Sequence, residues 1–360
     1  MKKIIWLFFL LVILLFSKPL WEDSASEYVD LSFLAPVDEW VDTLDIDQYV
    51  NVAKAYWMEM KDEPTVKVSS SEEVASGKGV ILDQISLGMK KSEIEKIHGT
   101  AQRVSLNEYD LVWHTYHENY ENFIMVSYDS DNKVNAIFTN QPGNSSFLGI
   151  QMDSNRDEVH VSLGEPLTKL RKGNIVYILP ESGEYDLFQM DDSYLTIFYD
   201  KHENNSVTGI QIMEKSVEKN HETTFGTPSV ELTKGFELQL FDLTNAARVF
   251  RGLSVLTYDE AVSNTARKHS EDMALHNYFN HENLNGESPF DRLEKDGLTF
   301  SYAGENLAYG QASSIFAHEG LMNSLGHRKN ILSADYSFLG VGTAFNKESA
   351  PYYTENFYAK

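Results

Sequence analysis

Three short polar motifs between Asn277 and Leu332 constrain the fold of this chain more than any other feature. The first ends at His281, the second contains Glu305 and the third contains His327, each beside a turn-forming Gly or Asn. These residues are 24 and 22 positions apart, so they can share one site only if the fold brings distant segments together. The pattern therefore predicts a cleft lined by two imidazoles and at least one carboxylate.

The composition indicates a globular protein and excludes some classes of function. Hydrophobic residues make up 42% of the 360 residues and aromatic residues 12%, which suits two or three domains that each bury a core. The formal charge of −24 argues against nucleic-acid binding, because that binding needs clustered Lys and Arg. The chain has no cysteine, which excludes disulfides, thiolate nucleophiles and Cys-ligated zinc.

The N-terminus has the pattern of an export signal. Lys2 and Lys3 precede an apolar run from Ile4 to Phe16, and its 13 residues fall short of the ~20 that span a bilayer. Residues 1–20 are either a signal peptide cleaved at an atypical site or an N-terminal membrane anchor. In both cases we expect the rest of the chain on the extracellular face, secreted or anchored, with membrane contact only through this segment.

Residues 21–79 have the composition of an acidic tether and linker. Asp and Glu dominate 22–63, where aromatic residues also recur at roughly helical spacing. Ser, Glu and Gly are frequent in 64–79. We expect one or two amphipathic helices followed by a flexible segment.

Residues 80–214 contain an internal repeat. Two short helical patterns end at Gly99 and Gly164, which are 65 residues apart, and each precedes segments that alternate apolar and polar residues. Each copy therefore predicts a helix followed by an antiparallel meander. The expected strands are 109–116, 123–128, 134–138, 175–179, 194–199 and 209–213. Four histidines lack ligand spacing and are expected to lie at the surface or to be hydrogen-bonded: His114, His117, His160 and His202.

The polar segment 214–234 is expected to be a linker, so we place the last domain at 235–360. Alternation predicts an antiparallel pair of strands over 338–345 and 351–357. Helices around such a sheet give an α+β sandwich. The apolar spacing predicts helices over 237–251, 256–277, 289–296 and 313–324.

A series of ordered motifs in this domain resembles a known family. The motifs include Leu243-Thr244-Asn245-Ala246, Tyr278-Phe279-Asn280-His281, Gly286-Glu287-Ser288-Pro289-Phe290-Asp291-Arg292, Gly304-Glu305-Asn306-Leu307, Gly326-His327-Arg328-Lys329-Asn330 and Gly340-Val341-Gly342. Together they resemble the CAP superfamily (cysteine-rich secretory proteins, antigen 5, pathogenesis-related 1) in its bacterial SCP-like form. The repeat before them resembles the CAP-associated domain that precedes bacterial CAP domains. The resemblance implies an α-β-α sandwich at the C-terminus.

The resemblance also implies a cleft with two His and two Glu that can bind zinc or another divalent metal. It assigns His281 and His327 as the histidines and Glu305 as the first glutamate. In animal and plant members the second glutamate follows a helix-end Trp by three positions. Ser324 holds that position here, and Glu319 on the same helix is the candidate replacement. The resemblance implies no cofactor other than a metal.

The chemistry of these residues leaves several roles open. Two His and one Glu match the ligands of catalytic zinc sites that keep one open position, where the metal acidifies a bound water. Without metal, a His beside a Glu can act as a general base, or the groups can hold a polar cleft open through mutual hydrogen bonds. The chain has no HExxH, GxSxG, P-loop or dinucleotide motif. Ser324, three residues before His327, is expected to cap a helix or form a turn.

Three functions therefore compete, and whether the protein is an enzyme stays open. As an exported binding module, it would bind an envelope lipid, glycan, peptide or protein through the His/Glu cleft. As a hydrolase, it would cut a peptide or ester in the same cleft. As a regulatory protein, it would dock a partner through the repeat domain. We favour binding, because the cleft lacks an evident nucleophile and its second carboxylate is missing from the expected position.

Overall fold

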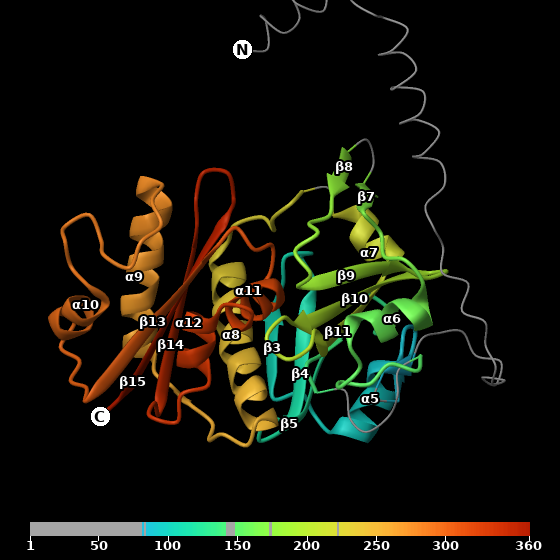
Figure 1. Cartoon of the computed structure of the whole chain (residues 1–360), viewed down its shortest axis with the longest axis horizontal. Coiled ribbons are helices and arrows are strands. Elements are labelled where there is room, and N and C mark those ends of the chain that lie inside the picture. The colour runs from blue at the N-terminus through green and yellow to red at the C-terminus, as the bar shows by residue number, and fades with distance from the viewer. Residues whose placement is uncertain (1–80, 83, 142–147, 173–174, 222) are drawn as a thin grey trace, which may run out of the picture. The chain divides into compact units, whose positions relative to one another are not determined.

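A computed structural model describes residues 81–360 except 83, 142–147, 173–174 and 222 (Figure 1). The expected export segment and acidic tether lie outside the described residues. The described residues belong to one compact unit. No helix within the described ranges combines the length and apolar character needed to cross a membrane.

The first half is built on a seven-stranded antiparallel sheet in the order β3-β4-β5-β6-β11-β10-β9. All six strands expected from sequence are present with shifted ends, whereas β1, β2, β3, β7 and β9 were not expected. The sheet strands are β3 (Arg103–Leu106), β4 (Val112–Glu118), β5 (Glu121–Tyr128), β6 (Val134–Thr139), β9 (Tyr185–Gln189), β10 (Ser193–Asp200) and β11 (Ser206–Glu214). Two small hairpins accompany it: β1 (Ile81–Leu82) with β2 (Ile85–Ser86), and β7 (Lys169–Lys172) with β8 (Ile175–Ile178).

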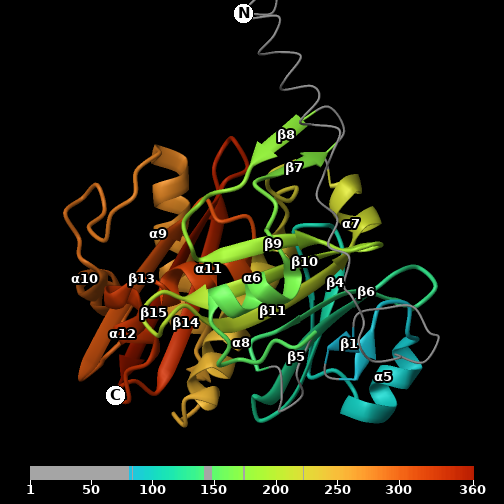
Figure 2. The same ribbon diagram turned by 45° about the vertical axis from the view of Figure 1, so that its right-hand side comes forward.

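Helices α5 (Lys91–His98) and α6 (Arg156–Leu163) cover one face of this sheet, where Ile94 and Val159 share one apolar cluster with the strands (Figure 2). They end in the same way, at Gly99 with φ 76 and ψ −162 and at Gly164 with φ 82 and ψ −163. A positive φ favours glycine because a Cβ would be strained there. The two helix-plus-strand segments meet where β6 pairs with β11. These features accord with the 65-residue repeat, which stays a prediction.

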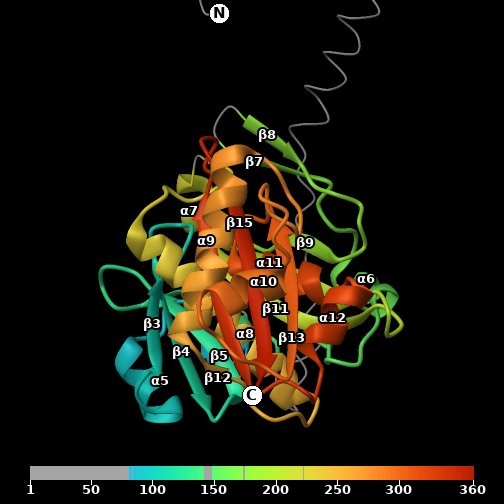
Figure 3. The same ribbon diagram turned by 90° about the vertical axis from the view of Figure 1, so that its left-hand side faces the viewer.

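The second half is an α-β-α sandwich around a four-stranded sheet in the order β12-β14-β15-β13. Helices α9 and α10 lie on one side of the sheet, and α8, α11 and α12 lie on the other (Figures 1 and 3). The strands are β12 (Thr257–Tyr258), β13 (Tyr302–Tyr309), β14 (Phe338–Phe345) and β15 (Pro351–Ala359). The helices are α8 (Val230–Phe250), α9 (Glu260–His276), α10 (Pro289–Lys295), α11 (Ser314–Met322) and α12 (Leu325–Ile331).

Glycines in β14 set the distance between this sheet and α9. A Cβ on Gly342 would lie 2.0 Å from the backbone N of Arg267, and one on Gly340 would lie 2.3 Å from that of Ser263. The helix backbone can therefore approach the strand only because these residues have no side chain. Helix α9 begins at Asp259, whose side chain accepts hydrogen bonds from two backbone amides of the first turn.

Helix α8 joins the two halves and begins inside the expected linker at 214–234. That segment contains α7 (Lys215–Asn220) and the first turn of α8. Gly235 lies inside α8, and a Cβ there would be 2.1 Å from the carbonyl oxygen of Leu106 in β3. Phe236 of α8 shares one hydrophobic cluster with Trp113 of β4. The start of the predicted last domain is therefore packed against the first half, and the linker at 214–234 and the domain bounds 80–214 and 235–360 stay predictions.

Candidate functional site

The site is centred on Glu305, in the middle of the edge strand β13. Its side chain is 1% exposed, and its Oε1 lies 2.9 Å from Nδ1 of His281. His281 follows α9, which ends at Asn277 in the left-handed conformation with φ 55, so the chain turns there toward β13. The side chain of His281 is 52% exposed. A buried carboxylate thus holds a solvent-accessible imidazole in one orientation.

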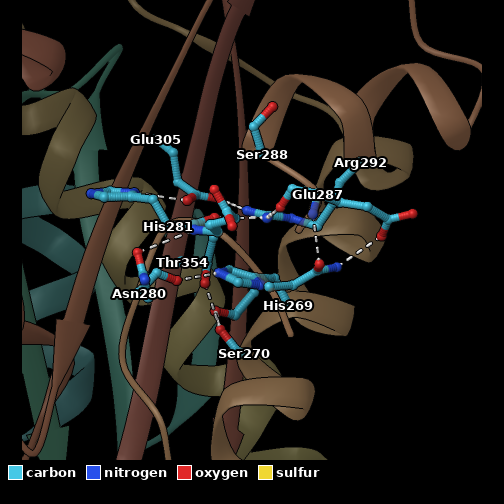
Figure 4. Close-up of polar contacts among 12 residues, drawn as sticks. His269, Ser270, Asn280, His281, Glu287, Ser288, Arg292, Glu305 and Thr354 are labelled. Atoms are coloured by element: carbon cyan, nitrogen blue, oxygen red, sulfur yellow. Dashed lines mark hydrogen bonds and ion pairs between the residues drawn. The ribbon is translucent and has the colours of Figure 1, made fainter. Parts of the chain in front are cut away.

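Arg292 holds the other oxygen of the same carboxylate. Its Nη2 donates to Oε2 of Glu305 at 2.6 Å, and its Nη1 donates to the carbonyl oxygens of His281 at 2.8 Å and Glu287 at 2.9 Å. Figure 4 shows the imidazole and the guanidinium on opposite sides of the carboxylate. Arg292 is placed by α10, which starts at a Ser288 cap that bonds reciprocally with Asp291. One arginine therefore fixes both the carboxylate and the loop that carries His281.

His327, on α12, lies near this pair. Its backbone oxygen accepts a hydrogen bond from Nδ2 of Asn306 at 3.2 Å. Burial lowers the pKa of His327, and the positive charge that His281 can carry lowers it further. The structure thus brings His281 and Glu305 into contact and His327 within electrostatic range. Their role as a functional site stays a prediction.

Glu319 does not join this site, contrary to the suggested replacement. The side chain is buried on the opposite side of α11, where Oε2 accepts a hydrogen bond from Oγ1 of Thr208 at 2.7 Å. Burial raises the pKa of Glu319 to about 7. Composition and spacing cannot show which face of a helix a carboxylate takes, and here α11 turns it toward β11. Ser324 is the residue before α12, but its side chain makes no capping hydrogen bond.

Glu305 is not free to act as a direct ligand of the metal that the resemblance implied, and the metal site stays a prediction. Both oxygens of Glu305 are already bonded, one to His281 and one to the guanidinium of Arg292. A metal bound directly by Oε2 would compete with that arginine. Within the described part of the chain, no group of three or more His, Cys, Asp or Glu residues has a metal-binding arrangement. We therefore derive no chemistry through a metal here.

A buried polar network lies behind the site and was not predicted from the sequence. Asn330 donates to the backbone oxygen of Glu305 at 3.3 Å and to Oδ1 of Asn306 at 2.9 Å. Asn306 in turn donates to Glu355 at 3.0 Å, and Thr244 donates to the same carboxyl group at 2.8 Å. Burial raises the pKa of Glu355 to about 7. Each of these residues lies in a family motif, which was the available signal, as it was for Arg292.

Two exposed aromatic side chains lie on the segments that carry the site: Phe279 is two residues before His281, and Tyr309 is four residues after Glu305. Phe279 is 49% exposed and Tyr309, at the end of β13, is 44% exposed. Their ring centroids are 6.0 Å apart, and the ring of Tyr309 also lies 4.3 Å from that of Tyr352. Exposed aromatics beside a fixed polar group are a common composition of binding surfaces. The four histidines that were expected to lie at the surface or to be hydrogen-bonded all make hydrogen bonds: His114, His117, His160 and His202.

The fold and these motifs define a CAP-domain protein. Residues 241–357 match the cysteine-rich secretory protein family, and residues 87–223 match the CAP-associated N-terminal family. The chain therefore carries a CAP domain preceded by a CAP-associated domain. This confirms the resemblance and the α+β fold class.

Two similar proteins come from Bacillus subtilis (strain 168). The membrane protein YlbC is 29% identical over 324 residues, which is 82% of this chain and 89% of YlbC. YkwD is 39% identical over 145 residues, or 40% of this chain, and this chain spans 54% of YkwD. The similarity to YlbC thus extends through both domains.

Solved structures of similar fold come from other bacteria. An extracellular protein containing an SCP domain from Bacillus anthracis is 23% identical with a TM-score of 0.67, covering 81% of this chain and 100% of that one. The cysteine-rich secretory protein SAV1118 from Staphylococcus aureus is 18% identical with a TM-score of 0.61, covering 76% and 94%. At these identities the two structures establish the fold and nothing further.

Proposed function

We propose that this chain is an exported surface protein that binds an envelope or extracellular ligand at His281. The observation that supports the proposal is the contact of an exposed imidazole with the buried Glu305, which Arg292 anchors. A side chain held in place before binding loses little conformational entropy when a ligand arrives, so more of the contact energy becomes affinity. His281 therefore has the fixed orientation that favours recognition of a ligand.

The surroundings of His281 support a ligand with both polar and apolar parts. Phe279 and Tyr309 offer exposed ring faces, while the imidazole offers a hydrogen-bond donor or acceptor. No hydroxyl group among the described residues is bonded to His281 or His327, so the structure provides no activated Ser or Thr nucleophile. Binding therefore has more support than covalent catalysis.

The site of action proposed is the outer face of the cell. The charged and apolar pattern of residues 1–20 supports export, and the relative YlbC is named as a membrane protein. Protease added to intact cells should digest the folded part of the chain. Full protection in intact cells that is lost on lysis would contradict export.

Envelope binding can be tested with one matched pair of variants. His276 is also exposed, at 46%, and its Nδ1 also lies 3.0 Å from a carboxylate, that of Asp272. The purified full chain should be titrated with separate lipid, cell-wall glycan and surface-protein fractions from the source cells. His281→Ala should weaken binding to one fraction by about tenfold or more, while His276→Ala should leave it unchanged. Equal effects of the two variants would exclude His281 as the recognition group.

Hydrolysis is a second candidate, favoured by the same contact. A carboxylate that binds Nδ1 leaves Nε2 of the imidazole available to take a proton from water as it attacks a peptide or ester carbonyl. The two candidates differ in one measurement. Turnover of peptide or ester substrates by the full chain, lost in His281→Ala and kept in His276→Ala, would support hydrolysis over simple binding.

A further inference from the structure

A cavity lies where the CAP-associated domain meets the CAP domain. It has a volume of about 80 Å³ and is lined by residues of β11, α8 and α11, by residues shortly after β6, β10 and α8, and by Met152. Glu319, which is absent from the His281 site, lines it. The cavity shares no lining residue with the surroundings of His281, so it needs an explanation of its own.

Two buried polar side chains lining this cavity lack partners. Asn140 is 4% exposed, and neither its Oδ1 nor its Nδ2 has a hydrogen-bond partner. His318 is 1% exposed, and its Nδ1 likewise has none. Buried side-chain polar groups are bonded in the large majority of cases, because an unmade bond costs about 1–3 kcal/mol. These three atoms therefore indicate that the cavity holds a polar molecule.

The cavity is also lined by charged groups of both signs, and these groups have hydrogen-bonding positions that no protein atom uses. The guanidinium of Arg251 makes a 3.3 Å bond to the carbonyl oxygen of Ala247 and a 3.7 Å contact with Asp200, which leaves donors over. The carboxyl group of Glu319 accepts one hydrogen bond, from Thr208. Burial is the first cause of its raised pKa, and a cation beside it would keep it ionised.

The remaining walls limit the size of an occupant. Met152, Val207 and Met322 supply apolar surface. Because one water-sized atom needs roughly 10–15 Å³ of such volume, the cavity accommodates about five to eight non-hydrogen atoms. The exposed side chains of Phe250 and Glu203 also line it and mark a route from solvent.

We propose that this cavity binds a small zwitterionic amino acid. Its carboxylate would lie against Arg251 and the amide of Asn140, and its ammonium group would lie against Glu319. A short apolar side chain would face Met152 and Met322. Alanine, with six non-hydrogen atoms, falls within the size range, and no ligand of a single charge would match both walls.

The proposal is tested by calorimetric titration of the full chain with glycine, L-alanine and D-alanine. At least one should bind with one-to-one stoichiometry and a dissociation constant at or below about 1 mM. Acetate and ethylamine each carry only one of the two charged groups, so the affinity of each should be at least about tenfold lower. A rise in thermal midpoint with the amino acid, absent with acetate, provides an independent readout on the unmodified protein.

Variants distinguish this cavity from the His281 site. Asn140→Leu should fill the space and abolish the heat of binding, whereas His281→Ala should leave it unchanged. Binding of acetate as strong as that of alanine would overturn the zwitterion assignment. Binding that is lost in His281→Ala and kept in Asn140→Leu would overturn the location. If none of the amino acids gives saturable binding or a thermal shift to the unmodified chain, the cavity does not bind this class and the proposal fails.

Discussion

Nη2 of Arg292 lies 2.6 Å from Oε2 of Glu305, and the two side chains are 8% and 1% exposed. The negative charge of the site is thus balanced from inside the protein by a neighbouring helix. An arginine in this position makes the carboxylate a support for His281 instead of an open ligand for a cation. This pairing is the structural basis of the proposed recognition role of His281.

Zinc titration provides the first prediction. Because both oxygens of Glu305 are engaged, zinc added to the full chain should show no binding that depends on His281, Glu305 or His327. Calorimetry of the unmodified chain and of the His281→Ala/His327→Ala variant should give the same heats. A zinc affinity that these substitutions remove, and that falls as the pH drops through ~6.5, would contradict this and restore the metal hypothesis.

The second prediction concerns the contact that connects α12 to the CAP-associated domain. Arg328, next to His327, lies 2.6 Å from the buried Asp200 and 2.5 Å from Glu203, whose side chain is 60% exposed. Asp200→Asn should destabilise the protein by about 3–5 kcal/mol, because it removes the buried anion that both Arg328 and Arg251 contact and leaves Arg328 with only the exposed Glu203.

Glu203→Gln is the matched control, since it removes a partner of the same arginine from an exposed position. It should cost no more than about 1 kcal/mol. Urea denaturation of both variants measures the difference. Similar losses in the two would mean that burial of Asp200 does not control the energy of this contact.

Much of the fold could be predicted because its signals are local. Asp259 followed by helical apolar spacing predicted α9, and alternation with glycine predicted β14 at 338–345, which matches the structure. Strand β13 could not be predicted in this way. Its centre is the polar pair Glu305 and Asn306, and these residues are buried only because distant segments supply their partners.

The site shows the same division between local and distant signals. The motifs identified His281, Glu305 and His327, and the first two are in contact. The position of Glu319 depends on how α11 packs against β11, a distant relationship that residue spacing does not carry. Gly235 likewise marks a close contact between α8 and β3, although its surroundings in sequence resemble a boundary.

The third prediction tests the contact between β14 and α9. Gly342→Ala would place a Cβ 2.0 Å from the backbone of Arg267, so it should destabilise the protein by about 1–3 kcal/mol or more. Gly326, at the start of α12, has nothing within 4 Å of an added Cβ. Gly326→Ala should therefore leave stability unchanged or raise it slightly, by up to about 1 kcal/mol. Thermal midpoints that fall equally in both variants would contradict the close approach.

The last prediction concerns pH and the buried carboxyl group of Glu355, whose pKa is raised from 4.5 to about 7 by burial. Between these values the unfolded chain releases a proton that the folded chain keeps, so the contribution of this group to stability falls as the pH rises from about 4.5 to about 7. The loss should be on the order of 3 kcal/mol. Glu355→Gln has no such proton and should lack this part of the decline.

Buried histidines such as His318, whose pKa is lowered to about 3, shift stability in the opposite direction, but they are present in both proteins and cancel in the difference. Urea denaturation of both proteins at pH 5 and pH 7 measures that difference. Equal changes between the two pH values would mean that Glu355 is ionised throughout and that its bonds to Thr244 and Asn306 outweigh its burial.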